Sequence, residues 1–210
     1  LGPARWLDRC RSASGLLWLA LVSVFLLYPM TGEAQQSRGK NRLHIVGGLG
    51  LAGELELPAG FDPDLDPGLA LRVGIERRVL ARLSLGGAIQ IEPWDPDGRV
   101  DGGVASDLMF LPRVDIPLAG SAGTIHFALG LGLTFNVLDD DFSFARAEAG
   151  GGTVYELMFG GSWPVSRQTD LVLELCYSRR DLEHEIEDSA AEYDIDIWRT
   201  RLAAGVSFDL

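Results

Sequence analysis

The segment from Gly123 to Val137 alternates, with a period of two, between large apolar residues and small or polar ones. The apolar members are Ile125, Phe127, Leu129, Leu131, Leu133, Phe135 and Val137, and the others are His126, Ala128, Gly130, Gly132, Thr134 and Asn136. Because successive side chains of a strand point to opposite faces, this pattern predicts a strand with one wholly apolar face. The strand would be longer than the ~5–6 residues usual in soluble proteins and long enough to cross a bilayer, which takes ~9–11 tilted residues. The pattern therefore indicates a membrane-crossing strand with its apolar face toward lipid.

The same alternation recurs along the chain and predicts eight strands. The first is expected to present Ile45, Leu49, Leu51 and Leu55 to lipid. Pro112 interrupts the fourth and cannot donate a ladder hydrogen bond, so we expect a bulge or local kink there. The predicted strands span residues 43–57, 67–78, 80–92, 104–118, 123–138, 151–164, 170–184 and 194–210.

The connections between these segments alternate in length. Short turns are expected near residues 77–78, 119–122 and 165–169, and longer loops rich in Asp, Gly and Pro at 58–66, 93–103, 139–150 and 185–193. An even number of antiparallel strands with short turns at one end and long loops at the other is typical of transmembrane barrels. We therefore predict an all-β fold: an eight-stranded antiparallel up-and-down transmembrane β-barrel, preceded by a signal peptide.

The N-terminal region carries the pattern of a secretory signal peptide. Arg5, Arg9 and Arg11 precede an apolar run from Leu16 to Met30, and small residues follow at the two positions that a signal peptidase reads, Gly32 and Ala34. A basic region, a short apolar run and a small-residue cleavage site define such a peptide, whereas a spanning helix needs ~20 apolar residues. An uncleaved anchor is the alternative reading. We predict cleavage of residues 1–34, a short periplasmic segment at 35–42 and the barrel at 43–210.

At this point the chain resembles the small outer-membrane β-barrels of the OmpA/OmpX-like kind. The resemblance covers residues 43–210, and its most specific element is the C-terminal run from Gly205 through Phe208 to Leu210. It implies location in the cell outer membrane, contact with outer-membrane lipid, a monomeric barrel, and recognition of Gly205, Phe208 and Leu210 by the outer-membrane insertion machinery. Many members end in Phe, whereas this chain ends in Leu210.

A soluble eight-stranded barrel such as a lipocalin is the alternative fold, because periodicity alone does not say which face points inward. Such a barrel places its apolar residues around an internal cavity and its polar residues in water. The second face of the predicted strands is mostly small and carries few charges, which favours the membrane barrel.

If the apolar faces meet lipid, charges of both signs line the interior. An eight-stranded barrel is just wide enough for side chains to fill, and an unpaired buried charge costs several kcal/mol. We expect Arg199 and Arg201 of the last strand to pair with Glu54 or Glu56 of the first and with Glu174 of the seventh. The predicted lumen charges are Glu54, Glu56, Arg72, Glu76, Arg82, Glu92, Asp107, Arg113, Asp115, Glu156, Glu174, Arg180, Arg199 and Arg201.

Three acidic residues in the first long loop, Asp62, Asp64 and Asp66, are weak candidates for calcium ligands. Calcium prefers such hard oxygen ligands, but the distal bidentate Glu of a calcium loop is missing here. Aspartates are also common in ordinary solvated turns. We expect no metal and no other cofactor.

Few residues point to catalysis or to nucleic-acid binding. His184, Ser178 and Glu187 are the only grouping that suggests a nucleophilic site, and their spacing is common by chance. Cys176 is the single cysteine after residue 34. The chain carries 18 Lys and Arg against 30 Asp and Glu, a net charge of −12, which argues against nucleic acid. We expect a non-enzymatic barrel with a structural or surface-interaction role and a lumen plugged by salt bridges. The alternatives are a narrow channel for ions or small solutes and a lipid-modifying enzyme.

Overall fold

The computed structural model describes residues 41–56, 63–95, 102–138, 150–185 and 192–210. The predicted signal peptide and nearly all of the predicted periplasmic segment lie outside these residues. The described part of the chain holds no helix that is long and apolar enough to span a membrane.

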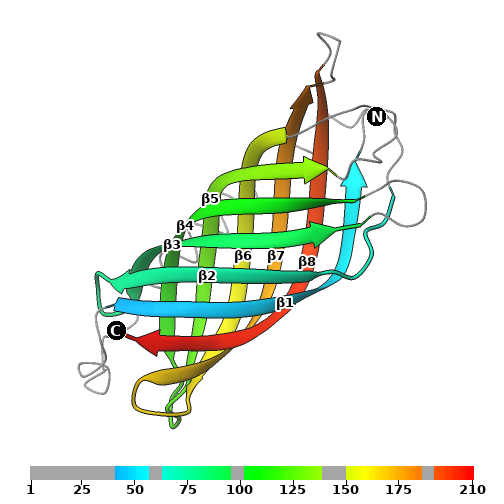
Figure 1. Cartoon of the computed structure of the whole chain (residues 1–210). Coiled ribbons are helices and arrows are strands. Elements are labelled where there is room, and N and C mark those ends of the chain that lie inside the picture. The colour runs from blue at the N-terminus through cyan, green and yellow to red at the C-terminus, as the bar shows by residue number, and fades with distance from the viewer. Residues whose placement is uncertain (1–40, 57–62, 96–101, 139–149, 186–191) are drawn as a thin grey trace, which may run out of the picture. The chain divides into compact units, whose positions relative to one another are not determined.

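The eight strands close into one antiparallel barrel in sequence order, with β1 pairing β2 on one side and β8 on the other (Figure 1). The observed bounds agree with the predicted ones to within a few residues, and the predicted fold class is confirmed. The strands are β1 (Asn41–Glu56), β2 (Leu69–Arg78), β3 (Leu83–Trp94), β4 (Gly103–Pro117), β5 (Thr124–Leu138), β6 (Gly150–Pro164), β7 (Thr169–Glu185) and β8 (Glu192–Asp209).

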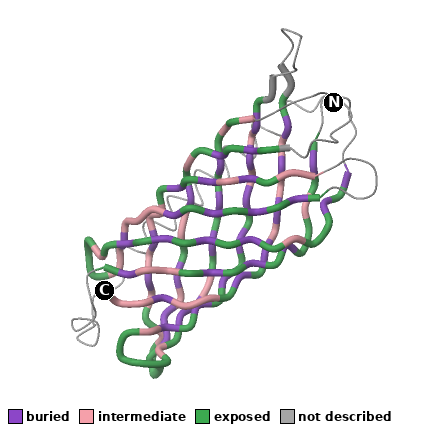
Figure 2. Tube along the Cα trace, viewed as in Figure 1, coloured by how far each residue is buried: buried purple, intermediate pink, exposed green. Residues whose placement is uncertain are grey.

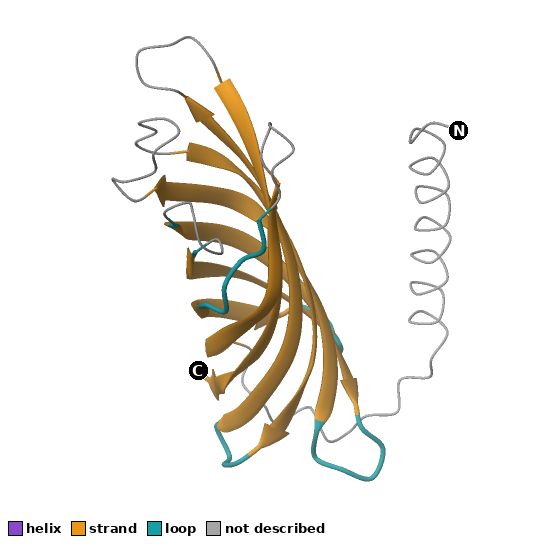
Figure 3. Ribbon diagram, turned by 90° about the vertical axis from the view of Figure 1, so that its right-hand side faces the viewer, coloured by secondary structure: helices purple, strands orange, loops and turns teal. Residues whose placement is uncertain are grey.

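The two ends of the barrel differ in their connections, as predicted. Residues 79–82, 118–123 and 165–168 form short turns at one end, where the last residues of β8 also lie, and longer connections join the strands at the other (Figure 3). In the second turn the φ of Gly120 is 76°, a left-handed conformation that favours glycine. We call these the turn end and the loop end. In outer-membrane barrels the turn end faces the periplasm.

Burial alternates along every strand between inward and outward residues (Figure 2). Large apolar side chains face outward and are exposed, including Leu133 (53%) on β5 and Leu71 (51%) on β2. Charged side chains face inward and are buried, including Arg180 and Glu156. A soluble barrel has the opposite arrangement. The outer wall is therefore built to face lipid, and the lipocalin-like alternative is wrong.

One prediction about β1 is wrong, because a β-bulge interrupts the strand. Its pairing with β8 shifts by one residue between Gly50 and Ala52. Since a one-residue insertion exchanges the two faces of a strand, Glu54 and Glu56 point outward and are exposed, whereas Leu55 is fully buried. These three residues were predicted on the opposite faces.

A second difference concerns Pro112 on β4. The ladder between β4 and β5 runs to the pair Phe110↔Leu131 and resumes in the same register at Arg113↔Ala128. The unchanged register means that no extra residue is inserted, so of the two expectations, a bulge or a local kink, the bulge is wrong. Toward β3, Pro112 keeps its place opposite Leu85.

Residues 63–68, which come just before β2, extend the barrel wall at the loop end. Leu65 N–H donates to the carbonyl oxygen of Gly53 at 2.9 Å, and Leu55 N–H donates to that of Pro63 at 3.0 Å. On the other side, Asp66 N–H donates to the carbonyl oxygen of Asp95 at 2.8 Å. This wall segment, residues 63–68, therefore joins the loop end of β1 to the chain just beyond β3.

Gly132 allows a close approach between β4 and β5, which leads to a prediction. A Cβ at Gly132 would lie 1.9 Å from the carbonyl oxygen of Leu108, a backbone atom. At Gly47 the nearest atom would be 4.0 Å away. We expect Gly132→Ala to lower the free energy of unfolding by about 1–3 kcal/mol, the usual cost of overpacking, and Gly47→Ala to have little effect. Urea unfolding of both variants in detergent measures the difference, and equal stabilities would contradict it.

Candidate functional site

Charged side chains of both signs are buried on the inward face of the barrel. Burying a charge without a partner is costly, and many of these residues pair across the lumen with residues of strands that are not their neighbours. Three of the largest fully buried side chains are arginines. Among the described residues, the buried charged side chains are Arg42, Arg72, Arg113, Arg180, Arg199 and Arg201 together with Glu76, Glu92, Asp107, Asp115, Glu156, Asp170 and Glu174.

Glu92 is the centre of the group nearest the loop end. Its Oε2 lies 2.6 Å from Nη2 of Arg180 and also accepts from Nη1 of Arg201. Arg180 reaches Oδ2 of Asp107 at 2.7 Å. Arg199 Nε lies 3.4 Å from Glu92 Oε1. One carboxylate is thus surrounded by three guanidinium groups, with Asp107 supplying a second negative charge.

Glu156 connects this group to a middle group around Arg72. Nη2 of Arg201 donates to one carboxylate oxygen of Glu156, and Nη1 of Arg72 donates to the other at 2.8 Å. Arg72 also pairs with Glu174 through Nη2 and lies 2.7 Å from the sulfur of Met158 through Nη1. The middle group therefore links β2, β6, β7 and β8 through the interior.

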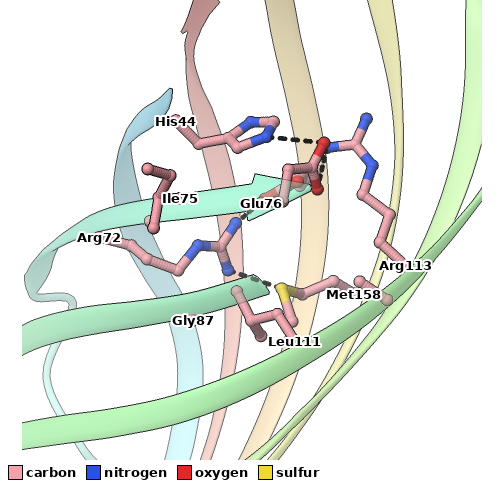
Figure 4. A pocket seen from close by; sticks show the side chains of 11 residues that line it. His44, Arg72, Ile75, Glu76, Gly87, Leu111, Arg113 and Met158 are labelled. Carbon is pink, nitrogen blue, oxygen red and sulfur yellow. Dashed lines mark hydrogen bonds and ion pairs between the residues drawn. The ribbon is translucent and has the colours of Figure 1, made fainter. Parts of the chain in front are cut away.

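A third group lies toward the turn end. His126 Nε2 is 2.9 Å from Oε1 of Glu174, and Arg113 Nε donates to Asp115 at 2.9 Å. Figure 4 shows His44 and Arg113 converging on Glu76, with His44 Nε2 3.0 Å from Oε1 of Glu76.

A cavity of about 30 Å³ lies among His44, Arg72, Glu76 and Arg113. This space is large enough for one or a few water molecules. The space left between these side chains is therefore small.

An apolar layer covers the ionic groups at the loop end. Leu65 of the wall segment packs inward with Leu55, which the β1 bulge turns into the lumen. Trp94 belongs to the same layer, and its Nε1–H donates to Oδ1 of Asn136 at 2.9 Å. On the inward face of the described strands, this layer lies nearer the loop end than the ionic groups around Glu92. The layer consists of Leu55, Leu65, Trp94, Ala105, Leu182, Ile195 and Ile197.

The structure brings together most of the predicted lumen charges but changes the partners of the last strand. Arg72, Arg113, Glu156, Glu174, Arg199 and Arg201 all lie in the interior. Arg201 pairs with Glu92 and Glu156, so its predicted pairing with Glu54 or Glu56 is wrong. The β1 bulge is the reason, because it turns both of these carboxylates outward.

Two other predicted lumen residues, Arg82 and Arg199, differ in detail from their predicted positions or partners. Arg82 lies in the turn before β3 and is half-buried, so it belongs to the turn end of the barrel rather than to its middle. Arg199 faces the lumen as predicted, but it pairs with Glu92 rather than with Glu54, Glu56 or Glu174, and its Nη2 also donates to the carbonyl oxygen of Asp66 at 2.5 Å. It therefore ties the wall segment to the interior.

Several interior residues were missed. Arg42, whose Nε donates to Asp209 at 2.9 Å, precedes the predicted start of the first strand. Gln90 Nε2 donates to Asp107 at 3.1 Å and to Glu156 at 3.2 Å. Because Gln90 carries no charge, it was not among the predicted lumen charges. Extending the alternation by one residue, and counting amides with the charges, would have found both.

The structure adds no support for the predicted calcium ligands or for the suggested catalytic grouping. Asp64 and Asp66 are exposed, Asp62 lies outside the described residues, and no group of three His, Cys, Asp or Glu residues in the described part is placed to hold a metal ion. Cys176 is buried with a free thiol. Glu187 of the suggested catalytic grouping is also outside the described residues. The Gly205, Phe208 and Leu210 insertion signal stays a prediction.

Comparisons of the sequence with family models and with curated proteins found no match. Solved structures do match the barrel. Neisserial surface protein A is 13% identical, with a TM-score of 0.56 over 83% of this chain and 100% of that one. The outer membrane protein OprG from Pseudomonas aeruginosa is 12% identical, with a TM-score of 0.55 over 82% of this chain and 96% of that one.

These likenesses concern the fold, which agrees with the outward apolar wall and the charged interior described above. The predicted resemblance is confirmed at this level: the chain has the fold of the small eight-stranded outer-membrane β-barrels.

Proposed function

We propose that this protein is an outer-membrane β-barrel with a structural or surface-interaction role, and that salt bridges close its lumen. The observation that carries the proposal is the buried ionic interior. The guanidinium groups of Arg72, Arg180 and Arg201 reach across the barrel to carboxylates on other strands. An interior of eight strands is only wide enough for its side chains, so a path for ions would require these pairs to separate.

The apolar layer at the loop end supports the same proposal. Leu55, Leu65 and Trp94 are almost completely buried there. An ion would lose its hydration in this layer with no polar partner in return, which is costly. The ionic groups and the apolar layer are two successive barriers.

Conductance in planar lipid bilayers tests this proposal. We expect the wild-type barrel to insert without steady openings, while a known porin inserted under the same conditions conducts. The double substitution Arg201→Ser with Glu156→Ser removes one charge of each sign and is expected to admit at most small, brief currents. Large and steady conductance of the wild type would reject a closed lumen and favour the channel alternative.

A further inference from the structure

A hollow of about 400 Å³ opens on the outer wall near the loop end, where β1, β7, β8 and the wall segment meet. Its floor is formed by Ala52, Gly53 and Thr200, whose small side chains leave the space open. The hollow lies at the β1 bulge and has the size of a small-molecule site.

Two aromatic rings form one side of the hollow. Tyr177 of β7 and Trp198 of β8 are in contact, with ring centroids 5.8 Å apart and planes tilted by 40°. The guanidinium carbon of Arg179 already lies 4.5 Å from the centroid of the Trp198 ring. These rings therefore offer the electron-rich surface on which cations bind.

Two carboxylates form the opposite side. Glu54 of β1 and Asp64 of the wall segment are paired across an isolated bridge, and both are exposed. Like charges directly opposite each other repel, and a cation held between them would remove that repulsion. Arg199 also lines the hollow, and its guanidinium contacts Glu92 and the carbonyl oxygen of Asp66.

An apolar strip continues from the hollow toward the middle of the membrane. Leu49, Leu202 and Leu175 are cross-strand neighbours on β1, β8 and β7, and all three are exposed on the lipid-facing wall. A ligand with a cationic head in the hollow could therefore lay an apolar chain along this strip.

We propose that the hollow binds a membrane lipid whose headgroup carries a primary ammonium, with the ammonium between Glu54, Asp64 and the two aromatic rings. The position of the hollow on the membrane-facing wall favours a lipid over a soluble amine. This site lies outside the lumen, so it does not depend on whether the barrel conducts.

Native mass spectrometry of the detergent-solubilised full barrel tests the site. Equal amounts of dilauroyl phosphatidylethanolamine and dilauroyl phosphatidylglycerol are added, which differ in the headgroup alone. We expect the first bound molecule of the ethanolamine lipid to bind roughly tenfold more tightly, equivalent to about 1.4 kcal/mol. A cation–π contact together with exposed ion pairs can supply this preference.

Matched variants show whether the lipid preference comes from the hollow or from the acidity of the outer wall as a whole. Glu54→Gln with Asp64→Asn should abolish the preference. Glu183→Gln with Asp194→Asn removes the same charge from an exposed cross-strand pair that does not line the hollow, and should keep it. Ala52→Phe fills the floor without changing any charge and should also abolish the preference.

Three results would overturn the proposal. The first is equal binding of the two lipids to the wild type. The second is equal loss in both double variants, which would assign the preference to the acidic wall as a whole. The third is equally effective competition by glycerophosphoethanolamine, which has the headgroup but no chains and would show that the ligand is a soluble amine. Heat-dependent gel migration identifies the folded fraction of each variant, and binding is compared on that fraction alone.

Discussion

Replacing Arg201 with methionine is expected to lower the free energy of unfolding by about 3–5 kcal/mol, the usual cost of removing one partner from a buried ion pair. Arg201 is almost completely buried and contacts the carboxylates of both Glu92 and Glu156. The substitution leaves Glu156 with Arg72 as its remaining cation within ion-pair distance among the described residues. Equilibrium unfolding in urea, followed by circular dichroism of the refolded protein in detergent, measures the change.

A double-mutant cycle with Glu156→Gln identifies the cause of that loss. The two substitutions together should cost less than the sum of the single ones, because neither charge is then left without its partner. Glu54→Gln is the matched control, since Glu54 faces outward, and should change stability by no more than about 0.5 kcal/mol. Equal effects of Arg201→Met and Glu54→Gln would contradict the interior assignment.

Leu131→Arg is the second substitution with a large expected effect. Leu131 lies in the middle of β5 on the outward face and is 39% exposed. A charge near the bilayer midplane on the lipid-facing side of a barrel costs about 2–4 kcal/mol. We therefore expect the unfolding free energy of Leu131→Arg in lipid vesicles to fall by this amount.

Ala122→Arg adds the same side chain in an exposed turn and should be nearly neutral, because a turn residue can place its charge in water. Leu131→Met keeps the apolar character at the first position and should cost less than about 1.5 kcal/mol. If Leu131→Arg were as stable as Ala122→Arg, the outer wall would not face lipid.

The eight strands and their lipid-facing sides could be predicted because large apolar residues alternate with small or polar ones along each segment. In β2, for example, Leu69, Leu71, Val73 and Ile75 alternate with small or charged residues, and all four are exposed. The lengths of the connections could also be predicted, because runs of Asp, Gly and Pro separate the alternating segments. These are local signals that a single sequence carries in full.

The bulge in β1 was not predictable in the same way. After Leu51 the sequence continues Ala52, Gly53, Glu54 and Leu55, and hydrophobicity alone assigns Leu55 to the lipid face. The structure turns it inward because the loop end of the lumen is itself apolar, so large apolar residues occur on both faces there. A pattern cannot distinguish two faces that have the same character.

The partners of the interior charges were the other part that could not be predicted. Alternation shows that Arg201 faces inward, but its partners Glu92 and Glu156 belong to β3 and β6, which are not neighbours of β8 in the sheet. Arginine is long enough to cross a narrow lumen, so adjacency in the sheet does not determine pairing. Which carboxylate each arginine reaches depends on the packing of the whole interior.

Gel migration of the protein from the outer-membrane fraction, with and without boiling, tests most directly whether this chain is a closed barrel in that membrane. We predict that the unheated protein is recovered in the outer-membrane fraction and migrates as a compact species, and that boiling shifts it to the mobility of the unfolded chain. Recovery in a soluble fraction, or identical migration before and after heating, would contradict the account.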